Sequence, residues 1–281
     1  MTGGTLHHRL VRSERQAPDR WLFFLHGFLG AGRNWASVAR GLVRARPDWG
    51  GVLVDLRLHG RSTELPPPHT IRACAQDVRD LVARLAPPEH AVLGHSFGGK
   101  VALAAGAAGS GGLRQIWMID STPDPGRTSA GATELLELLG RLPASFRSRR
   151  EAADRIEEAG YDRVVAEWLA TNLELCPGGY VWRFKLADLE MLLADFFRAD
   201  LWPVVTRPPP GVEIVAVRAT RDTILSDAAT RRIEGLHAAG RPVQLVTLDG
   251  GHWLNMENPT GLLRLLRQSL PGGAAGREPG S

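Results

Sequence analysis

Residues 92–103, "VLGHSFGGKVAL", decide how this chain folds. An apolar segment runs into Gly94-His95-Ser96-Phe97-Gly98 and then into further small and apolar residues. This is a G-x-S-x-G pattern, which is informative when it stands between a strand and a helix. The turn there is so tight that its neighbours must be small, and the serine hydroxyl stands clear at the carboxyl edge of a sheet. We therefore predict a nucleophile elbow with Ser96 as the nucleophile.

Apolar runs like the one before Ser96 recur along the chain, each bounded by turn residues. They are rich in Val, Ile and Leu without clean alternation, which is typical of strands buried on both faces of a parallel sheet. Helix-like segments at residues 34–45, 70–85, 99–108, 226–239 and 257–270 lie between or after them. The alternation predicts an α/β fold with a doubly wound, mostly parallel sheet and right-handed crossovers. The runs are "WLFFLHG", "GVLVDLR", "HAVLGHS", "QIWMIDS", "VEIVAVR" and "VQLVTLD".

One long segment interrupts this alternation. Residues 122–210 contain no strand-like run and instead carry helical patterns such as "ATELLELLGRL" and "LADLEMLLADFF". We expect a helical cap inserted late in the sheet. The predicted organisation is an α/β core of residues 1–121 and 211–270, the cap of residues 122–210, and a Pro/Gly-rich tail of residues 271–281 that we expect to be disordered.

The composition narrows the class of protein. The 281 residues are 43% hydrophobic and 23% charged, a normal globular balance. No window approaches the roughly 18 consecutive apolar residues of a membrane helix, and residues 1–20 lack the apolar core of a secretory signal. Cys74 and Cys176 are too few for a disulfide framework and fit no zinc motif. The net charge is +4 without a long basic run. We expect a cytoplasmic monomer or homodimer without metal, cofactor, membrane span or nucleic-acid partner.

A serine hydroxyl needs a base to activate it, and the base needs an acid to orient it. His252 follows the apolar run of residues 243–249 and two glycines, which places it on a loop after a late strand. Two aspartates close strands between Ser96 and His252. Asp222 lies after the penultimate strand, the more usual position, and Asp120 ends "IWMID"; either side chain can instead cap backbone N–H groups. We favour Asp222 and keep Asp120 as the alternative acid.

An oxyanion hole is expected where "FLHGFLGAG", residues 24–32, ends a strand. The N–H of Phe28 should turn toward the site. The second donor should be the N–H of Phe97, directly after the nucleophile. Each such donor typically contributes roughly 3–4 kcal/mol to transition-state stabilisation.

Motifs spread over about residues 22–270 resemble the α/β-hydrolase superfamily. They are, in order, "HGFLGAGRNW", "VLVDLRLHGRS", "GHSFGGKVAL", "MIDSTP", "RATRDTILSD" and "DGGHW". Residues 55–62 and 94–100 are most similar to a group of small intracellular esterases, which includes a bacterial acyl-ester hydrolase and a mitochondrial abhydrolase-domain protein. In that group the acid follows the sixth strand, which maps to Asp120. Several members lack an aspartate at the position of Asp222, whereas this chain has both.

The resemblance implies that the helical segment covers the catalytic edge and forms one wall of a pocket. The candidate substrate-binding residues are Trp182, Phe184, Phe196 and Phe197 in that segment, and Trp253 beside His252. The leading function is hydrolysis of small carboxylic esters through an acyl-enzyme. The same triad can act on thioesters, lactones or C–C bonds, or as an acyltransferase. A non-catalytic ligand receptor is disfavoured, because a binding protein has little reason to hold all three groups.

Overall fold

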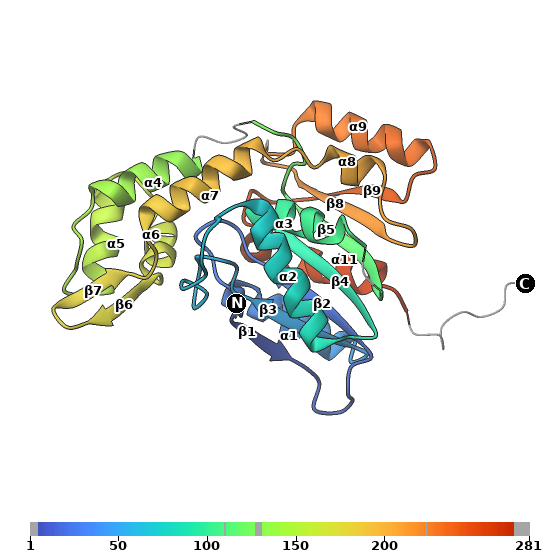
Figure 1. The fold of residues 1–281 in the computed structure, drawn as a ribbon, viewed down its shortest axis with the longest axis horizontal. Helices are drawn as coiled ribbons and strands as arrows, with labels where there is room; N and C mark the ends of the chain where they lie inside the picture. Colours follow the sequence, from blue (N-terminus) through green and yellow to red (C-terminus); the bar gives the residue numbers. More distant parts are fainter. Residues whose placement is uncertain (1–4, 110, 127–130, 223, 273–281) are drawn as a thin grey trace, which may run out of the picture.

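The computed structural model describes residues 5–109, 111–126, 131–222 and 224–272, and a seven-stranded sheet forms its centre (Figure 1). One edge strand is antiparallel to its neighbour, and all other neighbouring pairs are parallel. The predicted doubly wound, mostly parallel sheet is confirmed. The strands, in sheet order, are β1 (His8–Val11), β3 (Trp49–Val54), β2 (Arg20–Leu25), β4 (Glu89–His95), β5 (Leu113–Ile119), β8 (Glu213–Ala219) and β9 (Val243–Leu248).

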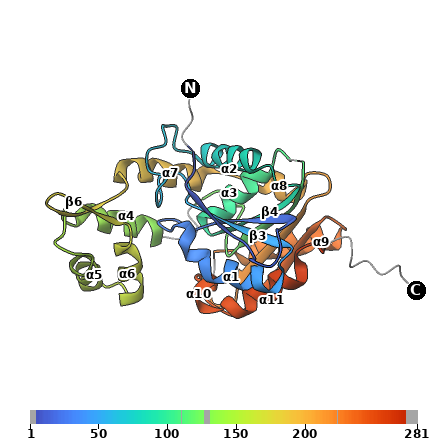
Figure 2. The ribbon, with the colours of Figure 1, turned by 90° about the horizontal axis from the view of Figure 1, so that it is seen from below.

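Helices cover both faces of this sheet, as the turned view shows (Figure 2). Successive residues of a strand point to opposite faces. In β2, Leu22 and Phe24 therefore face one helix layer, and Phe23 and Leu25 face the other. The first layer contains α1 (Ala36–Ala45), preceded by a 3-10 turn (Gly32–Trp35), and α11 (Pro259–Ser269), preceded by α10 (Leu254–Glu257); the second contains α2 (Ile71–Leu85), α3 (Phe97–Gly106) and α9 (Asp227–Ala238).

Local chemistry explains where α2 begins and ends. The Thr70 hydroxyl accepts a hydrogen bond from the N–H of Ala73 at 3.1 Å, which caps the first turn. Apolar residues recur at helical spacing and are buried against the sheet. The helix ends at Ala86, which has a φ of +44°, before two prolines that cannot continue it. The expected helix at residues 70–85 is therefore confirmed.

The segment between β5 and β8 is mostly helical, as expected, but it also holds a β-hairpin. The expectation that residues 122–210 lack strands was wrong. The two strands have four residues each and pair with each other around a turn where Gly178 and Gly179 take positive φ values of +97° and +135°, and Tyr180 forms one further bridge with Phe146. Strands this short carry too little pattern to be recognised. The elements are α4 (Gly131–Arg141), α5 (Arg149–Glu158), α6 (Arg163–Ala170), β6 (Leu173–Cys176), β7 (Gly179–Trp182), α7 (Leu186–Arg198) and α8 (Trp202–Thr206).

We call the described part of residues 122–210 the insert. Its α4–α6 and the β6–β7 hairpin lie to one side of the sheet, and α7 leads back toward it (Figure 1). The amide of Asn172 in the insert donates to the carbonyl oxygen of Leu29, in the turn after β2, at 2.9 Å. The insert thus contacts the carboxyl edge of the sheet. Among the described residues, no helix is long and apolar enough to cross a membrane. From residue 273 on, the predicted disordered tail lies outside the described residues.

Candidate active site

The elbow begins where β4 ends. Ser96 follows its last residue directly and has φ +51° and ψ −116°, a region that a side chain other than glycine rarely adopts. Its neighbours must be glycine, because a Cβ on Gly94 would collide with the carbonyl oxygen of Gly98. A Cβ on Gly98 would lie 2.6 Å from the carbonyl oxygen of His26. Helix α3 starts at Phe97, two residues earlier than expected, because no linker separates the serine from the helix.

The imidazole of His252 lies between two carboxylates. Its Nδ1 is 2.7 Å from Oδ2 of Asp120 and 3.2 Å from Oδ2 of Asp222. Asp120 directly follows β5 and is fully buried, and its other oxygen accepts the N–H of Ala219 at 3.1 Å. Asp222 lies after β8, and its other oxygen accepts the N–H of Ile224 at 3.0 Å. The structure thus brings both candidate acids to the same nitrogen, with Asp120 closer and more buried.

The charges around this nitrogen favour a proton on the imidazole. Burial acts to lower the pKa of His252, but the hydrogen bonds and charges of Asp120 and Asp222 outweigh it and raise that pKa to about 9. Burial raises the pKa of Asp120, and the neighbouring His252 opposes this change. The three side chains therefore share protons as one unit rather than titrating separately.

These three side chains also have the spacing of a metal site. Among the described residues, they form the one cluster of possible ligands whose ligand atoms all lie within 4.8 Å of one another. We interpret the cluster differently. A single imidazole nitrogen that faces two carboxylates has the geometry of a shared proton. With Nδ1 engaged in this way, Nε2 is the nitrogen left for a serine. Within the described part of the chain, Ser96 Oγ makes no hydrogen bond, so the hydroxyl is free to approach that nitrogen.

A second histidine holds the His252 loop in place. Nε2 of His95 lies 2.6 Å from the carbonyl oxygen of His252, and the two rings are 4.6 Å apart. Burial, followed by the charge of His252, lowers the pKa of His95 to about 3, so it is neutral and donates through Nε2–H. The sequence analysis did not identify this role of His95. Its position inside the elbow motif was the one available signal for this contact.

The two residues expected to donate to an oxyanion are Phe28, in the turn after β2, and Phe97, at the start of α3. Within the described residues, the N–H groups of Phe28 and Phe97 donate to no protein acceptor, and the two rings are 5.9 Å apart. His26 fixes the turn: its Nδ1 donates to the carbonyl oxygen of Gly27 at 2.8 Å, and its Nε2 accepts the N–H of Leu56 at 3.0 Å. Both N–H groups are therefore available to donate to a negatively charged oxygen.

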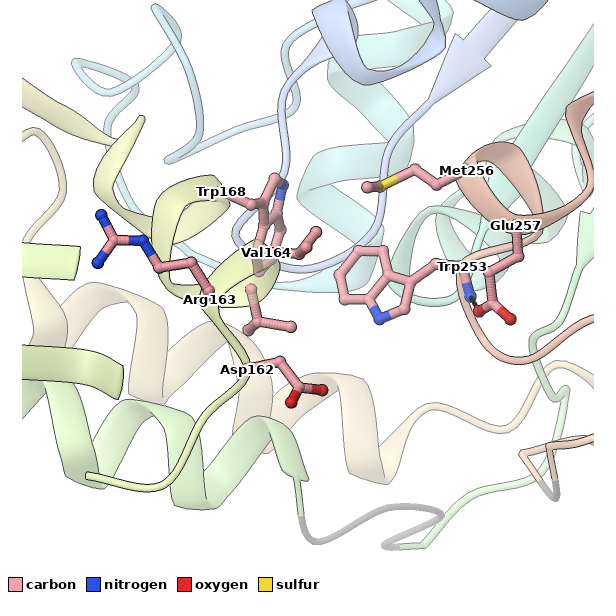
Figure 3. Close-up of a pocket in the computed structure, with 8 residues that line it drawn as sticks. Asp162, Arg163, Val164, Trp168, Trp253, Met256 and Glu257 are labelled. Carbon is pink, nitrogen blue, oxygen red and sulfur yellow. Dashed lines mark hydrogen bonds between the residues drawn. The ribbon is translucent and has the colours of Figure 1, made fainter. Parts of the chain in front are cut away.

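An apolar groove opens between α6 of the insert and α10 (Figure 3), and its lining residue Trp253 is the neighbour of His252 in the chain. Its volume is about 440 Å³. Trp253 packs edge-on against Trp168 with ring centres 4.7 Å apart, while Val164 and Met256 expose 62% and 49% of their surface. Of these residues the sequence analysis named only Trp253. The sequence signal that could have indicated this groove lies in α6, "RVVAEWLA", which has more apolar residues than one packing face of the helix needs.

The aromatic residues predicted in the insert divide into two places. Phe196 packs against Phe97, with ring centres 5.7 Å apart, and therefore lies beside the elbow; Phe197 packs on Phe196 at 5.5 Å. Trp182 and Phe184 stack on each other at 5.5 Å, at the hairpin end of the insert. A role in substrate binding remains a prediction for all four.

Comparison with known proteins identifies the family of this chain. Residues 22–265 match the model of the "Alpha/beta hydrolase family". The chain belongs to this family. The resemblance seen in the sequence motifs is thereby confirmed, and this alpha/beta hydrolase has relatives with established names.

One relative is the "sn-1-specific diacylglycerol lipase ABHD11" of Danio rerio, 31% identical over 246 residues that cover 85% of this chain and 74% of that protein. Another is "Esterase YbfF" of Escherichia coli, 24% identical over 269 residues that cover 94% and 98%. Among solved structures, the "Marine microorganism esterase" superposes with a TM-score of 0.78 at 22% identity, covering 94% of this chain and 98% of that one. The likeness to this structure supports the fold.

Proposed function

We propose that this alpha/beta hydrolase cleaves carboxylic esters with Ser96 as the nucleophile and His252 as the general base. The family and its named esterase and lipase relatives identify an ester-cleaving hydrolase. The residue roles are our inference from geometry. The observation that carries them is the strained Ser96 at the carboxyl edge of the sheet, near an imidazole whose Nδ1 faces two carboxylates.

The first half of the reaction forms an acyl-enzyme. Ser96 Oγ attacks the ester carbonyl carbon while Nε2 of His252 takes the hydroxyl proton. Negative charge develops on the carbonyl oxygen, where the N–H groups of Phe28 and Phe97 can stabilise it. The tetrahedral intermediate collapses, and the alcohol leaves with the proton from Nε2. Water then attacks the acyl group with the same base, which releases the acid and restores the serine.

We assign Asp120 as the acid that orients the imidazole, with Asp222 as a second carboxylate on the same nitrogen. The shorter distance, the full burial of Asp120 and the N–H of Ala219 on its other oxygen support this order. The sequence favoured Asp222, while the resemblance to small esterases favoured Asp120. Asp222 then acts mainly through its charge, by stabilising the imidazolium.

The insert is proposed to act as a cap that shapes the substrate pocket. Contacts between Asn172 and Leu29, between Phe196 and Phe97, and between the two tryptophans of the groove support this role. The groove suits an apolar part of a small-molecule ester. The cytoplasmic location and the monomeric or dimeric state remain predictions.

The test compares Ser96→Ala with Ser37→Ala, an exposed serine on α1. We expect Ser96→Ala to abolish turnover of short p-nitrophenyl esters with an unchanged melting temperature, and Ser37→Ala to retain it. A folded Ser96→Ala variant that keeps most of its turnover would exclude this serine as the nucleophile. The same assay on thioesters, lactones and alcohol acceptors separates ester hydrolysis from the alternative reactions of this triad.

A further inference from the structure

A second, polar cavity lies between the core and the insert. Its volume is about 350 Å³, and its walls come from β1 and β3, from the loops that follow β2 and β3, and from the end of the β6–β7 hairpin. Because β2 and β3 are parallel, these loops leave the same carboxyl edge that carries Ser96. The charged lining consists of Arg9, Arg33, Arg61, Arg183, His7 and Asp55.

The carboxylate in this lining is already engaged. Oδ1 of Asp55 accepts the N–H of Gly32 at 2.8 Å. Oδ2 accepts the backbone N–H of Arg61 at 3.0 Å and lies 3.0 Å from Nδ1 of His7. Asp55 thus holds the two loops together. Within the described residues it makes no ion pair with an arginine side chain.

The guanidinium groups around the cavity have few acidic partners. Arg33 donates to a neutral acceptor, the carbonyl oxygen of Thr171, at 3.2 Å. Nε of Arg183 lies 3.4 Å from a carboxylate oxygen of Glu174, a long and singly bonded ion pair. In the part of the chain that the structure describes, the guanidinium groups of two further arginines, at positions 9 and 61, have no hydrogen bond and no ion pair.

The electrostatics show that these cations are close enough to repel one another. Loss of solvent around the guanidinium lowers the pKa of Arg33, and the charges of Arg183, Arg149 and Arg61 lower it further, against Asp55. Like charges gathered around a cavity repel one another, and an anion between them would relieve that repulsion. The planar fork of arginine matches the two oxygens of a carboxylate or a phosphate.

We propose that this cavity binds an oxyanion, a carboxylate or a phosphate, at the distal end of the ester substrate cleaved at Ser96. The inference rests on the proposed function. Chain reach supports it: Phe28 and Arg33 belong to one loop and are five residues apart, so their Cα atoms lie at most about 18 Å apart. Hydrogen bonds from Gly30 to Gly27 and from Asn34 to Ala31 tighten this loop further.

Arginines from both the insert and the core line the cavity. Arg183 belongs to the insert, whereas Arg33 and Arg61 belong to the core. An oxyanion held by both sides would bind the insert to the core and close the pocket around the substrate. An ester without the distal anion would lack this contact. The cavity is therefore expected to select substrates by charge, while the apolar groove selects them by shape.

The test uses three p-nitrophenyl esters with acyl chains of equal length that end in a methyl group, a carboxylate or a phosphate, at constant ionic strength. The measured quantity is the ratio of kcat/KM for each anionic ester to that for the neutral ester. Arg33→Gln and Arg183→Gln should lower this ratio about tenfold each, which is about 1.4 kcal/mol, because each removes a charged hydrogen-bond donor to the anion. Arg44→Gln, an exposed arginine on α1, should keep the wild-type ratio. The ester whose ratio falls more identifies the oxyanion.

Inorganic phosphate and succinate supply an independent reading. Each should raise the melting temperature of the wild type more than that of the Arg33→Gln/Arg183→Gln double variant. A ratio equal in wild type and variants overturns the proposal, even if the anions raise the melting temperature. If the wild type cleaves no ester, the proposed function fails instead, and the melting temperatures still decide whether the cavity binds an anion.

Discussion

Replacing Asp222 by asparagine should move the pH dependence of ester hydrolysis to lower pH. The carboxylate lies 3.2 Å from Nδ1 of His252 and, with Asp120, holds the imidazole pKa at about 9 against burial. A general base must be neutral to accept a proton. The wild-type rate should therefore rise with pH up to about that value. Removing one of two carboxylates lowers the pKa, so the neutral base appears at lower pH.

Coulomb's law sets the size of this shift. Two unit charges 3.2 Å apart interact by about 5 kcal/mol at an effective dielectric constant of about 20, and by about 1 kcal/mol at about 80. The Asp222 side chain is 18% exposed, so solvent screening favours the lower part of this range. One pKa unit corresponds to about 1.4 kcal/mol, so we expect a downward shift of about one to two units. At pH 7 a shift of about one unit raises the neutral fraction of His252 from about 1% to about 10%.

The assay is kcat/KM for a neutral ester between about pH 5 and pH 10, fitted for the midpoint of the rising limb. Asp227→Asn removes a carboxylate that is 73% exposed and pairs with Arg218, and it serves as the control with an unchanged midpoint. An unmoved or alkaline-shifted midpoint in Asp222→Asn would show that the Asp222 carboxylate does not raise the pKa of His252. A loss at every pH larger than that of Asp120→Asn would give Asp222 the orienting role that the sequence favoured.

Three further changes test other parts of the account. Asp120→Asn should lower the plateau of kcat in the pH profile by up to about ten-thousandfold, because the imidazole loses its orienting partner. A decrease of the plateau by less than tenfold would contradict that role. Trp168→Ala should change the relative rates of esters with increasing acyl length, and a parental profile would place the specificity wall outside the groove. The buried ammonium of Lys100 donates to three backbone carbonyls of the insert, one near its start and two at the end of α7. Lys100→Met should therefore destabilise the protein by on the order of 3 kcal/mol, measured by urea unfolding, and an unchanged midpoint would show that these bonds are dispensable.

The features predicted well from the sequence depend on local chemistry. The elbow follows from Gly94 and Gly98, whose lack of a side chain is required by backbone atoms close in space. The central strands follow from long apolar runs. By contrast, β1 and the hairpin β6–β7 have four residues per strand, too few for a periodic signal. Their pairing depends on partners that the strands' own residues do not specify.

The choice between the two acids also depends on tertiary structure. Asp120 and Asp222 follow β5 and β8, which are neighbours in the sheet, so any sequence argument brings both near the histidine loop. A difference of half an ångström in their distances to Nδ1 arises from loop conformation. The contact of Trp168 with Trp253 and the position of Arg183 at the arginine-lined cavity likewise depend on how the insert packs against the core.

Covalent labelling tests directly whether Ser96 is the activated nucleophile. A fluorophosphonate reacts with an activated serine and leaves a stable phosphonyl group on its oxygen. Intact-mass and peptide mass spectrometry should show a single adduct on the peptide that contains Ser96, formed in parallel with the loss of esterase activity and absent in Ser96→Ala. An adduct on another residue, or esterase activity that survives complete labelling of Ser96, would contradict the account.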